Sequence, residues 1–225
     1  MFFNPLTCLF MIIFFFLLFF SFIMVQIHVI AFAFAKIGIP SEHIFGALLA
    51  SLLGSYVNIP LKKIPQENLV SRTWVSFYGF RHMIPVSQKR ETVLAVNLGG
   101  AVIPTFLCLY LLVKTDLWTS CLIATAAMSI FTYRVARPVP GLGIALPAFV
   151  PPLMAALIAV IIGYQNAPVI AYVSGTLGTL IGADLMNLDK IKDLGAPVAS
   201  IGGAGTFDGI FLNGILAVLL SAVFA

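Results

Sequence analysis

The stretch VIAYVSGTLGTLIGADLMNL, Val169–Leu188, carries an aspartate, Asp184, inside an apolar segment of helical length. A second apolar stretch, ASIGGAGTFDGIFLNGILAVLL (Ala199–Leu220), carries Asp208. Neither stretch contains a basic residue that would neutralise its acid. A charge at bilayer depth costs at least ~3 kcal/mol, so an acid inside a membrane segment indicates a functional site. The two acids can be protonated, share one proton or hold a cation, and each state corresponds to a different function.

The composition excludes an ordinary soluble domain, because 61% of the 225 residues are hydrophobic and only 9% are charged. The chain contains about seven apolar stretches of roughly the 20 residues that a membrane-spanning helix needs. We therefore predict an all-α polytopic membrane protein, a single transmembrane domain over residues 1–225. The predicted spans lie near residues 9–35, 43–60, 93–113, 116–134, 144–163, 168–188 and 198–222.

The cysteines and the charges exclude other classes. Cys8, Cys108 and Cys121 lie in apolar segments without the spacing of metal ligands, so we expect free thiols, no metal site and no cofactor. The net charge of +4 is assigned to topology and anionic lipid headgroups rather than to nucleic-acid binding. The lipid bilayer is the expected partner.

The basic residues predict the orientation of the chain. With seven spans, 10 of the 12 basic residues fall on the side of the N-terminus, and only Lys36 and Lys114 fall on the other side. The positive-inside rule then places the N-terminus in the cytoplasm and the C-terminus outside. Most of these cations lie in a basic loop, residues 61–92, in which Trp74 and other aromatic residues alternate with cations such as Arg72. Such a loop is typical of a membrane-surface anchor.

Two pairs of short strings suggest an internal repeat. LLGSYVNIPLKKI (Leu52–Ile64) is similar to LIGADLMNLDKI (Leu180–Ile191), and NLGGAVIPT (Asn97–Thr105) is similar to SIGGAGTFD (Ser200–Asp208). They would relate residues 9–113 to residues 144–222 as parallel three-helix units joined by a linker helix, an arrangement found in transporters. The alternative is chance similarity, because Gly, Ala and Leu are abundant in membrane helices.

Glycine, proline and asparagine accompany the two acids. Gly205 and Gly209 flank Asp208, and they either open the helix for a substrate or let neighbouring helices pack closely. Pro147 belongs to RPVPGLGIALPAFVPPL (Arg137–Leu153), which is either an unwound lining of the cavity beside Asp208 or a rigid approach with proline in the first helical turn. Asn187 either lines a polar path or caps a helix end.

The strings LLGSYVNIPL (Leu52–Leu61), GTLIGADLMNL (Gly178–Leu188) and ASIGGAGTFDGIF (Ala199–Phe211) resemble those of an uncharacterised family of prokaryotic polytopic membrane proteins. This resemblance implies location in a prokaryotic inner membrane. The two aspartates are also similar to those of the intramembrane aspartyl proteases of the presenilin and prepilin-peptidase type. That similarity implies that Asp184 and Asp208 are the catalytic pair, although Thr206 departs from the Gly-x-Gly-Asp motif of those enzymes.

Three interpretations therefore remain open: a hydrolase, a transporter, and a scaffold whose acids stay protonated. We favour the hydrolase, because two unpaired acids beside glycine on consecutive helices are its minimum constellation. In an intramembrane hydrolase, the two carboxyls would share a proton and activate a water molecule against a membrane-protein substrate. In a transporter, the same acids would couple protons or cations to the movement of a small solute. The hydrolase requires both acids at one depth. A helix that starts at Pro197 would place Asp208 roughly 16 Å along its axis, at ~1.5 Å per residue, whereas Asp184 lies near the cytoplasmic end of the preceding span.

Overall fold

The computed structural model describes residues 5–75, 81–139, 143–147, 149–193, 197–203 and 209–224. Its helices are α1 (Pro5–Lys36), α2 (Ser41–Gly54), α3 (Ile103–Thr115), α4 (Trp118–Val135), α5 (Val150–Gly163), α6 (Ala167–Thr179) and α7 (Gly209–Phe224). Shorter turns of π-helix are η1 (Leu98–Val102) and η3 (Leu180–Asp184), and 3-10 turns are η2 (Tyr164–Asn166) and η4 (Leu185–Asp193). The strands are β1 (Asn58–Val75), β2 (Arg81–Asn97), β3 (Arg137–Val139), β4 (Gly143–Ala145) and β5 (Val198–Ile201).

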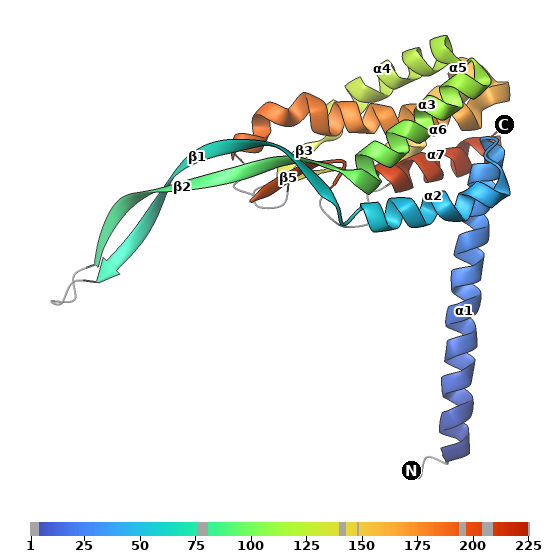
Figure 1. Ribbon diagram of the computed structural model, residues 1–225, viewed down its shortest axis with the longest axis horizontal. Coiled ribbons are helices and arrows are strands. Elements are labelled where there is room, and N and C mark those ends of the chain that lie inside the picture. The colour runs from blue at the N-terminus through green and yellow to red at the C-terminus, as the bar shows by residue number, and fades with distance from the viewer. Residues whose placement is uncertain are drawn as a thin grey trace.

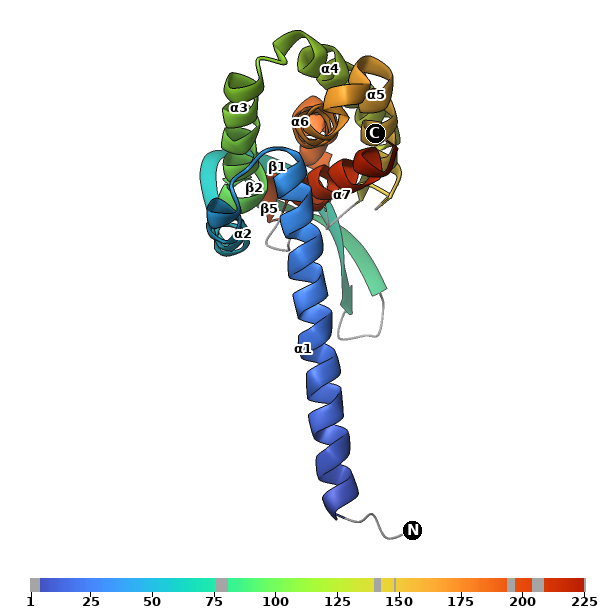
Figure 2. The same ribbon diagram turned by 90° about the vertical axis from the view of Figure 1, so that its right-hand side faces the viewer.

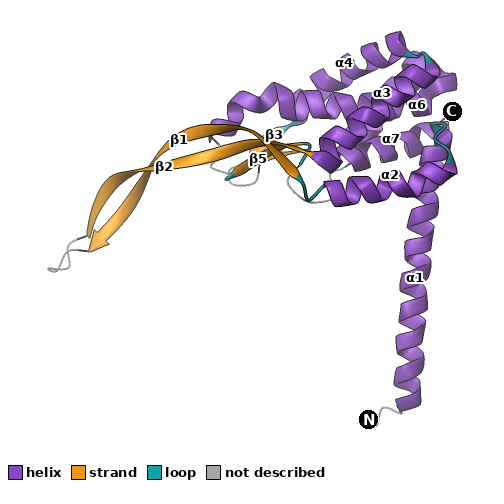
Figure 3. Cartoon of the chain, viewed as in Figure 1, coloured by secondary structure: helices purple, strands orange, loops and turns teal. Residues whose placement is uncertain are grey.

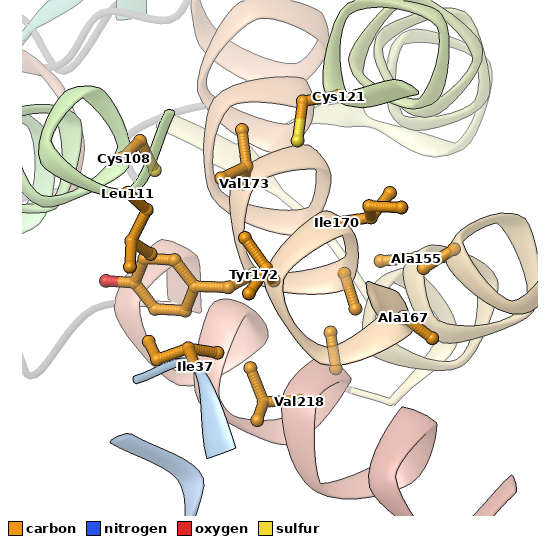
Figure 4. Close-up of a cluster of buried hydrophobic side chains, with 14 of the residues drawn as sticks. Ile37, Cys108, Leu111, Cys121, Ala155, Ala167, Ile170, Tyr172, Val173 and Val218 are labelled. Carbon is orange, nitrogen blue, oxygen red and sulfur yellow. The ribbon is translucent and has the colours of Figure 1, made fainter. Parts of the chain in front are cut away.

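Helix α6 lies at the centre of the helical bundle. Figure 2 shows α6 end-on, with α3, α4, α5 and α7 arranged around it. Eleven of its 13 residues are buried. A helix that is buried on all sides needs small and apolar residues around its whole circumference rather than along one stripe. Figure 4 shows this for Tyr172 and Ile170, whose side chains leave α6 toward different neighbours.

Glycine lets α4 approach α6 closely. A methyl group at Gly178 would lie 2.6 Å from Met128 Cβ, and one at Gly182 would overlap Thr132 Oγ1. The Thr132 hydroxyl also donates a hydrogen bond of 2.9 Å to the Gly178 carbonyl. Small residues and interhelical hydroxyl bonds are the usual means by which helices associate in a lipid environment. The contact between α4 and α6 therefore fixes the part of α6 that leads to Asp184.

Helices α5 and α6 form an antiparallel hairpin. The chain turns at Gly163, which leaves the helical conformation at φ −160° and ψ 79°. A methyl group at Gly163 would lie 2.7 Å from Ile170 Cδ1, and one at Gly175 would lie 3.3 Å from Ala155 Cβ. Contacts near the turn and far from it show that the two helices lie side by side. The continuous apolar stretch from Val150 to Lys190 therefore folds back on itself.

A long β-hairpin, formed by β1 and β2, extends beyond the helices (Figure 3). The two strands are antiparallel, with a register shift between Pro60 and Lys62. Strand β5 pairs in parallel with the end of β2, from Val93 opposite Val198 to Val96 opposite Ile201. The sheet order is therefore β1-β2-β5. Because β5 leads toward α7, the sheet joins the hairpin to the segment that carries the second acid.

Buried polar groups hold the base of this hairpin against α2. The Asn97 side chain donates to the Ser55 carbonyl at 2.7 Å and to Asn58 Oδ1 at 3.1 Å, and it accepts from the Gly100 amide at 2.8 Å. Ser200 of β5 donates to the same Asn58 oxygen at 2.6 Å. Buried amides are stable in a fold when their donors and acceptors are satisfied in this way. The network fixes where β1, β2 and β5 meet.

Helix α1 projects away from the bundle (Figure 1). Its C-terminal part packs on the core through Ala33 and Phe34, and the Phe34 ring lies 6.4 Å from that of Tyr172. Further toward the N-terminus, the side chains of residues 13–23 are exposed, although nearly all are large and apolar. Exposed apolar area of this extent is typical of a surface that contacts lipid or another protein.

The prediction of a mainly helical protein is confirmed, and a helix lies in each predicted span. Among the described residues, however, three stretches, and not seven, are long and apolar enough to cross a membrane: Ile13–Lys36, Leu98–Thr115 and Val150–Lys190. Two of the predicted spans are short as helices: α2 and α7 contain 14 and 16 residues, which at ~1.5 Å per residue is less than the ~30 Å hydrocarbon core. Helices α5 and α6, of 14 and 13 residues, share the single stretch Val150–Lys190.

Residues 61–92, predicted as a basic loop, lie largely within β1 and β2. The spans predicted at 43–60, 93–113 and 198–222 each include strand residues, and the span predicted at 144–163 becomes helical only at Val150. In that last segment, Pro151 and Pro152 occupy the first turn, where proline costs no hydrogen bond. The start of α5 therefore agrees with the interpretation of this segment as a rigid approach with proline in the first helical turn.

Candidate functional site

Asp184 is the last residue of η3, at the point where α6 leaves the core. Its side chain is half-buried, and Oδ2 accepts a hydrogen bond of 2.7 Å from the Gly202 amide. This bond crosses from the end of the sixth predicted span to the end of β5. A backbone amide that donates to a carboxylate restricts the carboxylate to one orientation. Asp184 is therefore held beside the segment that leads into α7.

The backbone at Gly202 determines where this amide points. Gly202 has a φ of +87°, which residues with a side chain rarely adopt. A methyl group there would also lie 2.6 Å from Ala101 Cβ and 2.7 Å from the Ala101 amide nitrogen. Gly203 follows with a φ of +94°, and its amide donates to the Ser200 carbonyl at 3.2 Å. Glycine is thus required at Gly202 both for its conformation and for the close packing against η1.

Asn187 stabilises the turn that carries Asp184. Its side-chain amide donates to the Gly182 carbonyl at 3.0 Å and to the Ala183 carbonyl at 2.9 Å. Its oxygen accepts from Lys190 Nζ at 2.7 Å. Both ends of the buried side chain are therefore used within the protein. The structure supports the predicted capping role of Asn187, and a contact of this residue with a substrate stays a prediction.

Of the other predicted site residues, Pro147 and Gly209 lie within the described part of the chain. Pro147 is exposed and lies shortly before α5, and Gly209 is the first residue of α7. Asp208 and Gly205 lie outside the described residues. Within the part of the chain that is described, no three His, Cys, Asp or Glu side chains form a group that could hold a metal ion.

The segment between Pro197 and the second acid is not the continuous helix that was expected. The prediction assumed a helix that begins at Pro197, with Asp208 eleven residues along it. Instead, Val198–Ile201 form strand β5, and α7 begins at Gly209, directly after Asp208 in the sequence. The estimate of roughly 16 Å along a helix at ~1.5 Å per residue is therefore wrong. A difference in depth no longer argues against a paired site.

An apolar pocket lies beside the contact between Asp184 and Gly202. It has a volume of about 400 Å³, is open to the surface, and is lined by residues of β1, β2, η1, α3, β5 and the turns after α6. Leu185 and Ile201, the sequence neighbours of Asp184 and Gly202, line its wall together with Leu61, Ala101, Phe106 and Leu109. Because the lining is almost entirely apolar, the pocket fits an apolar group rather than a charged one.

The Gly202 amide could not be recognised from sequence as the partner of Asp184. The glycines before Asp208 were interpreted as parts of one helix, and a backbone amide carries no residue-specific signal. The available signal was the Gly202-Gly203 pair, because consecutive glycines often mark a backbone with positive φ. A strand and a turn before α7, rather than an opened helix, account for this pair.

The chain belongs to the DUF1614 family, described as proteins of unknown function, whose model matches residues 52–220. The match begins in α2 and ends in α7, so it includes the hairpin, Asp184, Gly202 and the apolar pocket. No curated protein and no solved structure matches the chain.

Proposed function

We propose that this DUF1614 protein is an intramembrane hydrolase in which Asp184 and Asp208 form the catalytic pair. The hydrogen bond from the Gly202 amide to Asp184 is the observation that carries the proposal. It holds Asp184 against Gly202, which precedes Asp208 by only six residues in the sequence. Strand β5 supports the same pairing, because it takes the place of the continuous helix that would have separated the two acids in depth.

The chemistry requires the two carboxyls to differ in protonation. The ionised carboxyl takes a proton from a water molecule while the water oxygen attacks the carbonyl carbon of a peptide bond. The protonated carboxyl gives its proton to the carbonyl oxygen, and a tetrahedral intermediate forms. The carbon–nitrogen bond then breaks. The leaving nitrogen takes up the proton held by the first carboxyl, and one hydroxyl of the intermediate returns its proton to the second carboxyl as the new carboxylic acid forms. One proton shared by the pair is restored at the end.

The apolar pocket favours a substrate that places an apolar side chain in the pocket, next to Asp184. Leu185 and Ile201 extend the pocket to the residues that carry the hydrogen-bonded contact. A membrane-protein substrate would supply such a residue from its own spanning segment. The protein itself would lie in a prokaryotic inner membrane, with the N-terminus in the cytoplasm and the C-terminus outside. A membrane-impermeant thiol reagent should then label a cysteine added after Ala225, and not one added before Met1, in intact cells.

Asparagine variants test the catalytic pair without removing its structural contacts. In Asp184→Asn, the side-chain oxygen can still accept the bond from Gly202. In Asp208→Asn, the side chain keeps its size and a hydrogen-bond acceptor oxygen. Neither variant can exchange the proton that the mechanism needs. We expect each to lower cleavage by about 10²–10⁴-fold.

The assay uses purified protein in phosphatidylglycerol and phosphatidylcholine vesicles, with synthetic peptides that contain ~20 apolar residues. Mass spectrometry detects newly formed peptide ends. Asp189→Asn is the matched control, because Asp189 is an exposed acid in η4 only five residues from Asp184. The control should cleave like the unmodified protein. Cleavage that persists in either Asp184→Asn or Asp208→Asn would refute the proposal.

A proton- or cation-coupled transporter is the second candidate, and the parallel pairing of β2 and β5 favours it. Each strand runs in the same direction into a pair of glycines, Gly99-Gly100 or Gly202-Gly203, and then toward a helix, α3 or α7. This arrangement supports the two parallel units that the sequence suggests. A pH-sensitive dye enclosed in the vesicles would detect proton movement, which Asp184→Asn should abolish. Proton movement without peptide cleavage would favour the transporter.

A further inference from the structure

Three buried side chains in the helical core have polar atoms without a protein partner. These atoms are the Tyr172 hydroxyl and Thr176 Oγ1 of α6, and Asn213 Oδ1 of α7, and among the described residues none finds a hydrogen-bond partner. All three residues are more than nine-tenths buried, with relative exposures of 1%, 0% and 4%. Buried polar groups are normally satisfied by the protein or by bound water, because an unsatisfied group pays its full desolvation cost.

The three side chains lie along the contact between α6 and α7: Tyr172 and Thr176 lie beside Gly214, and Asn213 lies against Gly175 and Thr179. Thr176 lies beside both Tyr172 and Cys108 of α3, although neither contact has the geometry of a hydrogen bond. A methyl group at Gly214 of α7 would lie 2.5 Å from Thr176 Oγ1 and 3.1 Å from the Tyr172 ring. Asn213 precedes Gly214 in the same helix. In Figure 4 the Tyr172 hydroxyl points toward the α3 residues Cys108 and Leu111.

The orientation of the Asn213 amide is determined by its neighbours. Its nitrogen donates to the Gly175 carbonyl at 2.8 Å and to Thr179 Oγ1 at 2.5 Å. A flipped amide would bring two oxygens together at Gly175, because a backbone carbonyl cannot donate. The side-chain oxygen is therefore an acceptor that needs a donor, and no described residue supplies one.

Other hydroxyls of the bundle are satisfied differently. Thr132, Ser129 and Ser221 each donate to a carbonyl of their own helix, at 2.9, 2.7 and 2.9 Å. This is the usual way in which a helical hydroxyl is paired inside an apolar bundle. Thr176 does not make this bond. Ser174 is also unpartnered, but it is two residues from Thr176, on another side of α6, and belongs to a different environment.

We infer that the interface of α3, α6 and α7 is a site for bound water, held by Tyr172, Thr176 and Asn213. Water is the ligand that this set of groups fits, because the two hydroxyls can donate or accept and the amide oxygen can only accept. A buried water typically makes about three hydrogen bonds to groups that would otherwise be unsatisfied. The set contains no carboxylate to balance the charge of a cation. The site does not depend on the proposed hydrolase.

The site lies on the same helix as Asp184. Tyr172, Thr176 and Thr179 recur at intervals of four and three residues, the spacing of one helix face, and the chain continues through η3 to the acid. The bound water would thus occupy the core end of a line of hydroxyl groups that follows α6 toward Asp184.

Radiolytic hydroxyl-radical labelling with mass spectrometry tests for bound water directly, because radicals formed from an enclosed water oxidise the side chains around it. The full-length protein is labelled in detergent. We expect Tyr172 to be oxidised although it is buried. Met128 is the matched control, since it is fully buried against Gly178 and a thioether is at least as easily oxidised as a phenol. Labelling of Met128 but not Tyr172, or of neither, would overturn the inference.

Thermal unfolding of Thr176→Val gives an independent result. In a hydrated site this variant removes one partner of the water, and we expect the Tm to fall by about 2–4 °C. In a dry site it removes an unsatisfied hydroxyl, so the Tm would rise and the inference would be wrong. Tyr172→Phe should change the Tm in the same direction as Thr176→Val. Replacement of sodium chloride by choline chloride should leave the Tm unchanged, and a rise of Tm specific to sodium would assign the site to a cation instead.

Discussion

Substitution of Gly202 by alanine tests whether the Gly202 backbone is what positions Asp184. Two costs are expected. The first is conformational, because a residue with a side chain pays about 1–2 kcal/mol for a left-handed backbone such as φ +87°. The second is steric, because the new methyl group would start 2.6 Å from Ala101 Cβ. An ordinary carbon–carbon contact is ~3.5–4.0 Å, so η1 and the turn after β5 must separate.

The two costs can be combined into a measurable shift. Overpacking of this kind costs about 1–3 kcal/mol. The total is therefore about 2–5 kcal/mol, which for a chain of this size corresponds to a fall in Tm of about 4–20 °C. Differential scanning fluorimetry of the purified protein in detergent measures the Tm. In vesicles, peptide cleavage by Gly202→Ala should also fall, since the displaced amide no longer holds Asp184.

Two glycines elsewhere provide matched controls. Gly143 has a φ of +123°, but a methyl group there meets nothing within 4 Å, so Gly143→Ala tests the conformational cost alone. Gly46 is exposed within α2 and also has open space, so Gly46→Ala should raise stability by up to about 1 kcal/mol. A Tm for Gly202→Ala equal to that of the unmodified protein, or lowered only as far as that of Gly143→Ala, would refute the packing argument.

Three further predictions follow from the helices and the sheet. Asn97→Leu removes the hydrogen bonds that join α2, β1 and η1, so the free energy of unfolding, measured by guanidinium denaturation, should fall by about 2–4 kcal/mol. Gly182→Ala pushes α4 away from η3, and a fall in Tm of at least about 2 °C is expected; no change would contradict the close packing. Lys63→Met breaks an exposed ion pair with Glu91, 3.5 Å apart, and should cost less than about 0.5 kcal/mol, the loss disappearing in high salt.

The positions of the helices could be predicted from sequence. Each of the seven apolar stretches contains one of the helices α1 to α7, because helix formation depends on bonds between residues four apart and on local composition. The number of membrane spans could not be predicted in the same way. Four stretches were extended into residues that form strands or turns, such as Val198–Ile201, because apolar composition alone does not distinguish a buried strand from the end of a helix.

The site was predicted in part. Asp184 was identified as an acid in an apolar segment, and the structure holds it at the end of α6 with a hydrogen bond from Gly202. The capping role of Asn187 was one of two interpretations, and its contacts with Gly182 and Ala183 agree with it. The pairing with Asp208 stays a prediction, because that residue lies outside the described part of the chain.

The apolar character, the order of the helices and the position of Asp184 near the end of an apolar stretch follow from the sequence alone. Tertiary structure alone decided that α6 is the central helix, that residues 58–97 form a hairpin and that β5 joins it. These features rest on contacts between distant residues: Ser51 bonds to the carbonyl of Gly99, 48 residues away, and Ser200 bonds to Asn58, 142 residues away. Local propensity cannot specify such contacts, because strand pairing and helix burial depend on which surfaces the folded chain brings together.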